Sequence, residues 1–131
     1  MKKQFSISWK NSTQTRKQRK YRYNAPLHIK QKFMHSHLSK ELQTKYGKKA
    51  CGLKKGDKVK IARGQFKKIE NKVEEIDLKK CRVYITGADI TKKDGNKTRY
   101  PIHPSNLIIT ELNMDDKMRE KALKRKSGKN A

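Results

Sequence analysis

The sequence is poor in apolar residues and contains no long hydrophobic run. Of its 131 residues, 32% are hydrophobic, whereas globular domains usually contain about 45–50%. Only part of the chain can therefore fold around its own core, and the rest must be disordered or become ordered on a partner. No stretch approaches the roughly 18 apolar residues of a transmembrane helix, so membrane insertion is not expected. The length fits one domain with extensions.

Cysteine is scarce, and its spacing does not indicate a metal site. Cys51 and Cys81 are 30 positions apart, and no apolar segment typical of a secretory signal follows the basic N-terminus. This predicts reduced thiols in the cytoplasm. With His35 and His37 they form no Cys-x-x-Cys or His-x-x-x-His pair, so no zinc site is expected. Cys81 is expected to be a small, partly buried apolar residue.

Catalytic motifs are also missing. Nothing couples a nucleophile to a base, and no Walker or dinucleotide-binding glycine loop is present. We therefore expect no enzyme activity, no cofactor and no small-molecule substrate. Glu74, Glu75 and Asp77 cluster, but a solvated strand edge or local ion pairs with Lys79 and Lys80 explain them. Such acids would also keep that face turned toward solvent.

Acidic residues are few, and the charge is uneven. The chain has 36 Lys and Arg against 12 Asp and Glu, a net charge of +24. Residues 1–55 contain 16 of the basic residues and a single acid, Glu41. Self-repulsion opposes compaction unless a polyanion neutralises the chain. Nucleic acid is favoured because counterion release rewards each phosphate contact. An anionic membrane surface would need a helix with a wide apolar face, and no long stretch supplies one.

Residues 1–23 are expected to form a basic extended arm that is disordered alone. Tyr21 and Tyr23 alternate with Arg19, Lys20 and Arg22. Aromatic rings between cations can stack on unpaired bases while the charges hold the backbone. The alternative is a solvated tail with two incidental tyrosines.

Residues 24–52 predict two short helices that dock on the β-barrel that follows or on the RNA partner, since both are too short to be stable alone. Asn24 is a possible cap of the first helix, and Pro26 suits its first turn. Ser39 is the expected cap of the second helix, and Gly47 its left-handed end. The first helix carries a loose apolar stripe of Leu27, Ile29, Phe33 and Met34.

Residues 53–112 predict a small β-barrel of short strands. Lys58–Arg63 alternates apolar and basic residues and is closed by Gly64. Asp94 and Gly95 mark a hairpin turn, and Pro101 and Pro104 exclude a central strand between them. The other candidate strands are Asn71–Asp77, Arg82–Thr86, Lys97–Tyr100 and Leu107–Glu111. The expected core is Val59, Ile61, Val73, Ile76, Val83, Ile85, Leu107 and Ile109.

Residues 113–131 predict a C-terminal helix with a basic tail. Asn113 is the expected cap, acids follow it, and Lys124 and Arg125 come near the end, which matches the helix dipole.

Several segments together resemble one protein family. The run Lys55–Gly64, followed by Phe66-Lys67, Lys72–Ile76 and Val83–Gly87, resembles the KOW motif. Three further segments match one family of KOW proteins in order: Asn24–Ile29, then Leu38–Leu42 with Tyr46-Gly47, then Ile102–Asn106. Together they are similar to the archaeal and eukaryotic form of large-ribosomal-subunit protein number twenty-four of the universal set, from about Thr15 to Leu123.

The resemblance implies a mainly β fold: a small SH3-like (KOW) barrel with two short N-terminal helices, the basic arm and the C-terminal helix. It also implies a structural protein of the cytoplasmic ribosome that binds large-subunit rRNA early in assembly, near the nascent-peptide tunnel exit, beside neighbouring large-subunit proteins. The arm, the barrel loop Arg63–Lys72 and the loop His103–Asn106 should meet RNA. His103 either donates to a phosphate or packs. The expected rRNA-binding residues are Arg16, Lys17, Arg19, Lys20, Tyr21, Arg22, Tyr23, His28, Lys30, Lys32, Lys54, Lys55, Arg63, Gly64, Lys67, Lys68, Asn71, Lys72, Lys92, Lys93, His103, Ser105 and Asn106.

The chain departs from the family pattern at two positions of the barrel loop. Lys68 stands where the family commonly has glycine, and Asn71 replaces the strongest glycine of the motif. Asparagine tolerates a left-handed backbone better than most residues, so we expect the turn at Asn71 to survive. Lys68 adds a cation suited to phosphate contact.

Two other functions share part of the pattern. A KOW-type transcription-elongation factor should carry an additional α/β domain before the KOW unit, and residues 1–52 are too short and too basic for one. A nonspecific RNA chaperone would share the charge but would not need the matching segments in this order.

Overall fold

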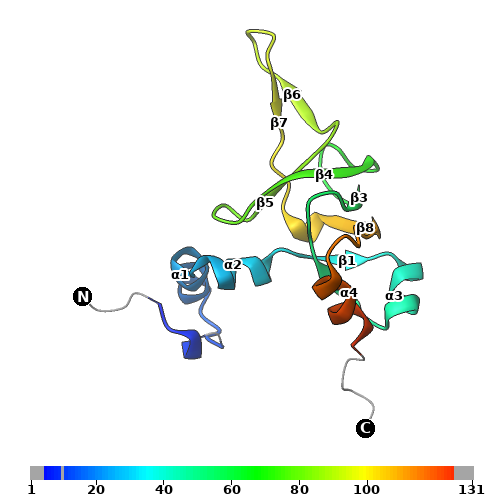
Figure 1. Ribbon diagram of the computed structural model, residues 1–131. Helices are drawn as coiled ribbons and strands as arrows, with labels where there is room; N and C mark the ends of the chain where they lie inside the picture. The colour runs from blue at the N-terminus through cyan, green and yellow to red at the C-terminus, as the bar shows by residue number, and fades with distance from the viewer. Residues whose placement is uncertain (1–4, 10, 126–131) are drawn as a thin grey trace.

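The computed structural model describes residues 5–9 and 11–125, and it is built on a curved six-stranded sheet (Figure 1). Its strands are β1 (His35–Leu38), β2 (Ala50–Gly52), β3 (Lys58–Ile61), β4 (Glu70–Asp77), β5 (Arg82–Ile85) and β8 (Leu107–Glu111). The order across this sheet is β2-β1-β8-β3-β4-β5. A bridge between Val83 and Ile102 joins β5 to the chain leading into β8, so the sheet closes on itself and the predicted barrel is confirmed.

The strand β1 was not predicted, although it extends the sheet beside β8. It pairs in parallel with β8, His37 opposite Ile108, and antiparallel with β2, Ser36 opposite Cys51. Its burial alternates, because Ser36 and Leu38 point inward and the two histidines outward. Residues 24–52 therefore supply two strands of the sheet as well as helices.

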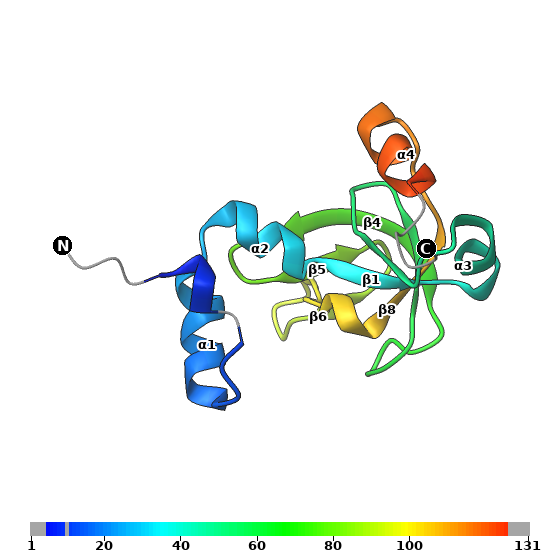
Figure 2. The same ribbon diagram turned by 90° about the horizontal axis from the view of Figure 1, so that it is seen from below.

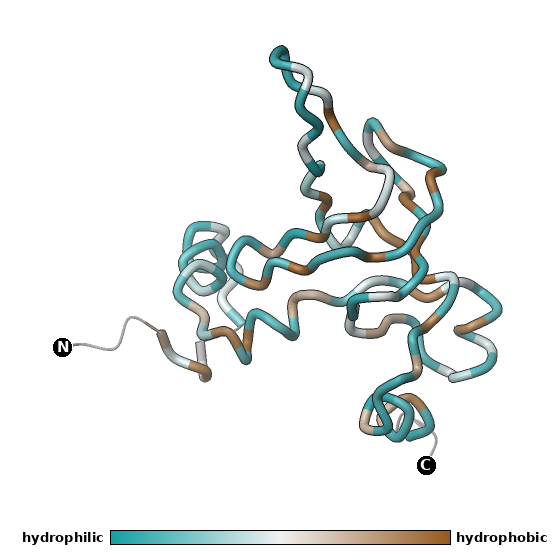
Figure 3. Tube along the Cα trace, turned by 45° about the horizontal axis from the view of Figure 1, so that its top comes forward, coloured by the Kyte–Doolittle hydropathy of each residue, from teal (hydrophilic) through white to brown (hydrophobic). Residues whose placement is uncertain are grey.

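The core confirms most of the predicted residues. Seven of the eight expected side chains are buried, and Ile76 packs against them while partly exposed. The alternation of β3 and β8 accounts for this, since inward residues of a strand repeat every second position. Met34, Leu38, Leu53, Ala88 and Ile102 complete the cluster. Figure 3 shows the apolar segments gathered along the central strands.

A separate hairpin of β6 (Asp89–Thr91) and β7 (Lys97–Arg99) projects away from the barrel (Figure 1). All residues of both strands are exposed, and the tip is hydrophilic in Figure 3. The predicted turn is confirmed, with Gly95 at φ 85°. The prediction that Lys97–Tyr100 forms a barrel strand was wrong, because this segment pairs only with β6.

From Thr15 onward the N-terminal arm is helical and not extended. Thr15–Asn24 forms α1, after a short 3-10 turn, Ile7–Trp9. Its residues are mostly Arg, Lys and Gln, which have good intrinsic helix propensity, and Tyr21 packs on Phe5 and Phe33 with ring centroids 4.9 and 6.1 Å apart. Intrinsic helix propensity and this small aromatic contact therefore stabilise α1, although the helix has no apolar stripe.

The remaining helices begin and end partly as predicted. The helix α2 (Leu27–Phe33) follows Pro26, whereas Asn24 is the last residue of α1 and not a cap. In α3 (Lys40–Tyr46), the Ser39 hydroxyl accepts from the Leu42 N–H and Gly47 is left-handed, as predicted. The helix α4 (Lys117–Lys124) is capped by Asp116 and not by Asn113. Residues 126–131 of the predicted basic tail lie outside the described residues.

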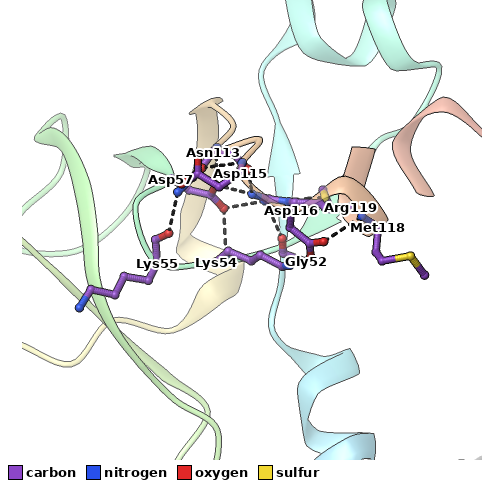
Figure 4. Close-up of polar contacts among 10 residues, drawn as sticks. Gly52, Lys54, Lys55, Asp57, Asn113, Asp115, Asp116, Met118 and Arg119 are labelled. Atoms are coloured by element: carbon purple, nitrogen blue, oxygen red, sulfur yellow. Dashed lines mark hydrogen bonds and ion pairs between the residues drawn. The ribbon is translucent and has the colours of Figure 1, made fainter. Parts of the chain in front are cut away.

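A buried ion pair fixes α4 to the barrel (Figure 4). The guanidinium of Arg119 donates to both carboxylate oxygens of Asp57, at 2.6 and 2.7 Å, and to the carbonyls of Gly52 and Asn113. The same carboxylate accepts from the backbone N–H groups of Lys54 and Asn113. Burial disfavours the charged guanidinium, but hydrogen bonding and charge at Asp57 offset this and raise the pKa of Arg119 above its ordinary value.

Among the non-glycine residues of the barrel loop, Lys68 and not Asn71 is left-handed. Lys68 has φ 77°, and its N–H donates to the carbonyl of Ile61 at 2.9 Å. Asn71 lies inside β4, opposite Val59, with extended backbone. The loop therefore closes with a lysine in the conformation that glycine adopts at no steric cost, and the expectation for Asn71 was wrong.

Candidate nucleic-acid interface

A basic groove lies between the N-terminal helices and the turn that joins β4 to β5. Its cavity has a volume of about 390 Å³. Lys30 on α2 donates to the carbonyl of Lys79 at 3.3 Å, which holds the helix beside the turn. Leu78, Lys79 and Lys80 form this turn, as predicted. The groove is lined by Arg22, Tyr23, Lys30, Phe33, Lys79, Lys80, Cys81, Arg82 and His103.

A second cavity adjoins this groove and shares Arg82 and His103 with it. It has a volume of about 320 Å³ and lies between the barrel loop and the proline-braced segment before β8. Its lining residues are Ile61, Arg63, Gly64, Gln65, Phe66, Arg82, Tyr100, Pro101, Ile102, His103 and Asn106. We call the first cavity the basic groove and the second the loop cavity. Together they form a basic surface that runs from α1 to the barrel loop.

Gly64 lets the barrel loop leave β3 with an open backbone. Its φ of 98° is in the left-handed region, and a Cβ there would meet no atom within 4 Å. Glycine is thus required by the backbone and not by packing. The exposed main chain beside Arg63 is accessible to a ligand.

His103 holds the Pro104–Asn106 turn at the junction of the two cavities. Its Nδ1 accepts from the Ser105 N–H at 3.3 Å, and the Ser105 hydroxyl lies 2.8 Å from it. Burial lowers the pKa of His103 below its ordinary value of 6.5, and the positive charges of Arg82 and Arg22 lower it further. The imidazole is therefore neutral at neutral pH, with a ring nitrogen accepting from the turn.

The depressed pKa of His103 predicts a pH effect. A pKa lower in the folded than in the unfolded chain gives stability that is present above pH 6.5 and is lost as the pH falls through the folded value. Titration of the His103 ring by NMR should give a midpoint below 6.5, and Arg82→Gln should raise it. Arg63→Gln is the matched control in the same cavity, and an equal rise in that variant would contradict this assignment.

The cations of α1 continue the basic surface beyond the groove. Figure 2 shows α1 at one end of the molecule and α3 at the other. No acid interrupts Thr15–Asn24. Tyr23 is 83% exposed, whereas Tyr21 is half-buried in the aromatic contact described above. Of these two tyrosines, Tyr23 is therefore the one whose ring is open to a base. The basic residues of α1 are Arg16, Lys17, Arg19, Lys20 and Arg22.

Several predicted contact residues lie away from this surface. Lys32 and Lys54 line a third cavity beside α4, and Lys54 forms an ion pair with Asp116. Lys92 and Lys93 are near the tip of the projecting hairpin. The others are exposed or partly exposed and line neither of the two cavities: His28 on α2, Lys55 before β3, Lys67 and Lys68 in the barrel loop, Asn71 and Lys72 on β4, and Ser105 in the turn.

Three cations of the basic groove were not predicted as contact residues: Lys79 and Lys80 in the β4–β5 turn, and Arg82 at the start of β5. The sequence predicted a solvated strand edge or ion pairs with these lysines for the nearby acids. Glu74 and Glu75 are exposed, and they contact Arg99 at 3.4 and 2.6 Å and not the lysines. A register shift between Val73 and Glu75 turns both glutamates outward. The basic run Lys-Lys-Cys-Arg could have indicated a phosphate contact from the sequence alone. Its position beside α2 could not be predicted, because it depends on the fold.

Other kinds of site find no support in the described residues. No group of three or more His, Cys, Asp or Glu in the part of the chain that the structure describes is placed to hold a metal ion. Among the described helices, none is long and apolar enough to cross a membrane.

Comparison with known proteins identifies relatives over most of the chain. The family of eukaryotic ribosomal protein L26 and its archaeal L24 counterpart matches residues 12–126. The chain is 48% identical over 114 residues to the "Large ribosomal subunit protein uL24" of Methanothrix thermoacetophila, covering 87% of this chain and 98% of the relative. It is 49% identical over 115 residues to the protein of the same name from Methanosphaera stadtmanae, covering 88% and 98%.

Proposed function

Because the chain belongs to the family of eukaryotic L26 and archaeal L24 ribosomal proteins, we propose that it binds large-subunit rRNA through the basic groove, the loop cavity and α1. It is a structural constituent of the large subunit of the cytoplasmic ribosome and not an enzyme. Its role is to neutralise and position RNA, so phosphate contacts should dominate over base reading.

The continuity of the basic surface carries this proposal. Arg82 and His103 line both cavities, so cations from α1, α2, the β4–β5 turn and the barrel loop lie along one path. Arg63 and Arg82 are exposed and form no ion pair with any described residue. Their charges are therefore available to phosphates without first breaking an internal pair.

We also propose that the protein joins the subunit early and lies near the tunnel exit beside other large-subunit proteins. The resemblance of the four sequence segments supports this placement. The elongation-factor and chaperone hypotheses rest only on the KOW pattern and the charge, and the family match over residues 12–126 explains both features.

Cosedimentation from a cell extract in a high-salt sucrose gradient tests the proposal. A loosely bound cationic protein should be released, because its affinity falls steeply with salt. A protein folded into rRNA should stay with the large-subunit peak. Release to the top fractions, or migration with RNA polymerase, would overturn the ribosomal proposal.

A further inference from the structure

We infer that the loop cavity is a binding site for one unpaired RNA base, which leaves its own helix and stacks on Phe66 and Tyr100. The inference rests on the proposed function and specifies what the interface accepts. The loop cavity would bind a base, whereas phosphate contacts alone are proposed for the basic groove.

The walls of the loop cavity are suited to a flat apolar ligand. The rings of Phe66 and Tyr100 have centroids 5.1 Å apart and are inclined by 54°. Both are only half-buried, so each keeps uncovered ring surface. Ile61 and Ile102 are 1% and 4% exposed, and they line the same cavity as apolar atoms already packed in the core. Stacking of an RNA base on such rings is a general means of single-strand recognition.

The rim of the loop cavity is suited to the backbone on either side of that base. Arg63 and Arg82 both line it and are exposed. Guanidinium groups bind phosphates in a planar, bidentate way. One nucleotide can therefore place its base against the uncovered surface of these rings while adjacent phosphates contact these cations.

Asn106 supplies a polar group at a fixed place in the cavity. Its backbone N–H donates to the His103 carbonyl at 3.0 Å, and its carbonyl accepts from Ala62 at 2.8 Å. Within the described residues its side-chain amide makes no hydrogen bond, so a donor and an acceptor remain for a base edge. A base whose Watson–Crick edge is accessible in this way must be unpaired.

The size of the cavity is sufficient for one base and too small for a segment of double helix. Its volume of about 320 Å³ lies at the lower end of the range of roughly 300–1,000 Å³ for small-ligand sites. A double helix keeps its bases stacked and paired, so the inserted nucleotide must come from a loop, bulge or junction.

The test compares binding of purified wild-type and variant proteins to large-subunit rRNA. Phe66→Leu/Tyr100→Leu keeps apolar volume but removes the rings, and Tyr100→Phe is the matched control that keeps stacking. The double variant should bind about 10-fold more weakly with an unchanged salt slope, because stacking releases no counterions. Ultraviolet crosslinking and mass spectrometry should locate a nucleotide on Phe66 or Tyr100 in the wild type and the control.

Asn106→Ala gives an independent readout that does not depend on the aromatic core. One nucleotide protected in the wild-type complex should become reactive at its Watson–Crick edge, while backbone protections persist. If the wild type binds with a steep salt dependence but neither variant differs from it, the base site is overturned and the proposed function stands. If the wild type itself shows no salt-dependent binding to the rRNA, the proposed function fails.

Discussion

Replacing Arg119 with methionine is expected to lower the free energy of unfolding by about 3–5 kcal/mol, the cost of leaving a buried charge without its partner. The carboxylate of Asp57 is fully buried, and its two oxygens would lose the guanidinium while still accepting from Lys54 and Asn113. The helix α4 would also lose its main polar attachment. Urea unfolding followed by circular dichroism measures the change.

Two further variants distinguish the effect of breaking the buried ion pair from the effect of removing one positive charge. Lys124→Met removes an exposed charge that pairs with Glu120 on the same helix, and it should leave stability nearly unchanged. Asp57→Asn/Arg119→Met should cost less than the sum of the single variants, because neither partner is left as an unpaired charge. A loss below about 1 kcal/mol for Arg119→Met would contradict the expected cost of leaving the buried carboxylate without its partner.

Removing three cations from the basic groove is expected to weaken rRNA binding by about 10- to 100-fold at 0.1 M salt. The variant Lys30→Gln/Lys79→Gln/Arg82→Gln changes one residue of α2, one of the β4–β5 turn and one shared by both cavities. Each lost phosphate contact should lower the slope of log affinity against log salt by about one. Titration of labelled rRNA at several salt concentrations measures both quantities.

The matched control removes the same charge at the opposite end of the molecule. Lys40→Gln/Lys45→Gln/Lys49→Gln changes α3 and the segment after it, and Figure 2 shows α3 far from α1. The control should keep nearly the wild-type slope. Equal losses in the two triple variants would mean that net charge, and not the groove, determines binding.

The barrel strands were predictable because their signals are local. Alternation in Lys58–Ile61 and Leu107–Glu111 reports which residues face the core, and glycines or prolines mark their ends. The strand His35–Leu38 lacks β-branched residues and forms because β2 and β8 offer edges on both sides. That contact comes from distant parts of the chain, so the local sequence carried no signal for it.

The contact surface was predictable in composition but not in arrangement. The sequence marked the arm, the barrel loop and His103 as cationic or polar, yet nothing in it placed Lys79 beside Lys30. The pair of Asp57 and Arg119 was missed for the same reason, since 62 positions separate them. Turn chemistry suggested a left-handed Asn71, but the hydrogen bond from Lys68 to Ile61 sets the conformation at Lys68 instead.

The parallel pairing of β1 with β8 has a consequence for how the chain folds during synthesis. His37 lies opposite Ile108, so β1 leaves the ribosome long before its neighbour exists. Contacts of such high sequence separation slow folding, because the intervening loop must close before they form. The cationic α1 segment is complete before β8 is made, so the RNA contacts proposed for α1 do not require a closed barrel. We therefore expect α1 to be able to contact rRNA before the barrel closes, with the completed barrel then fixing the final position.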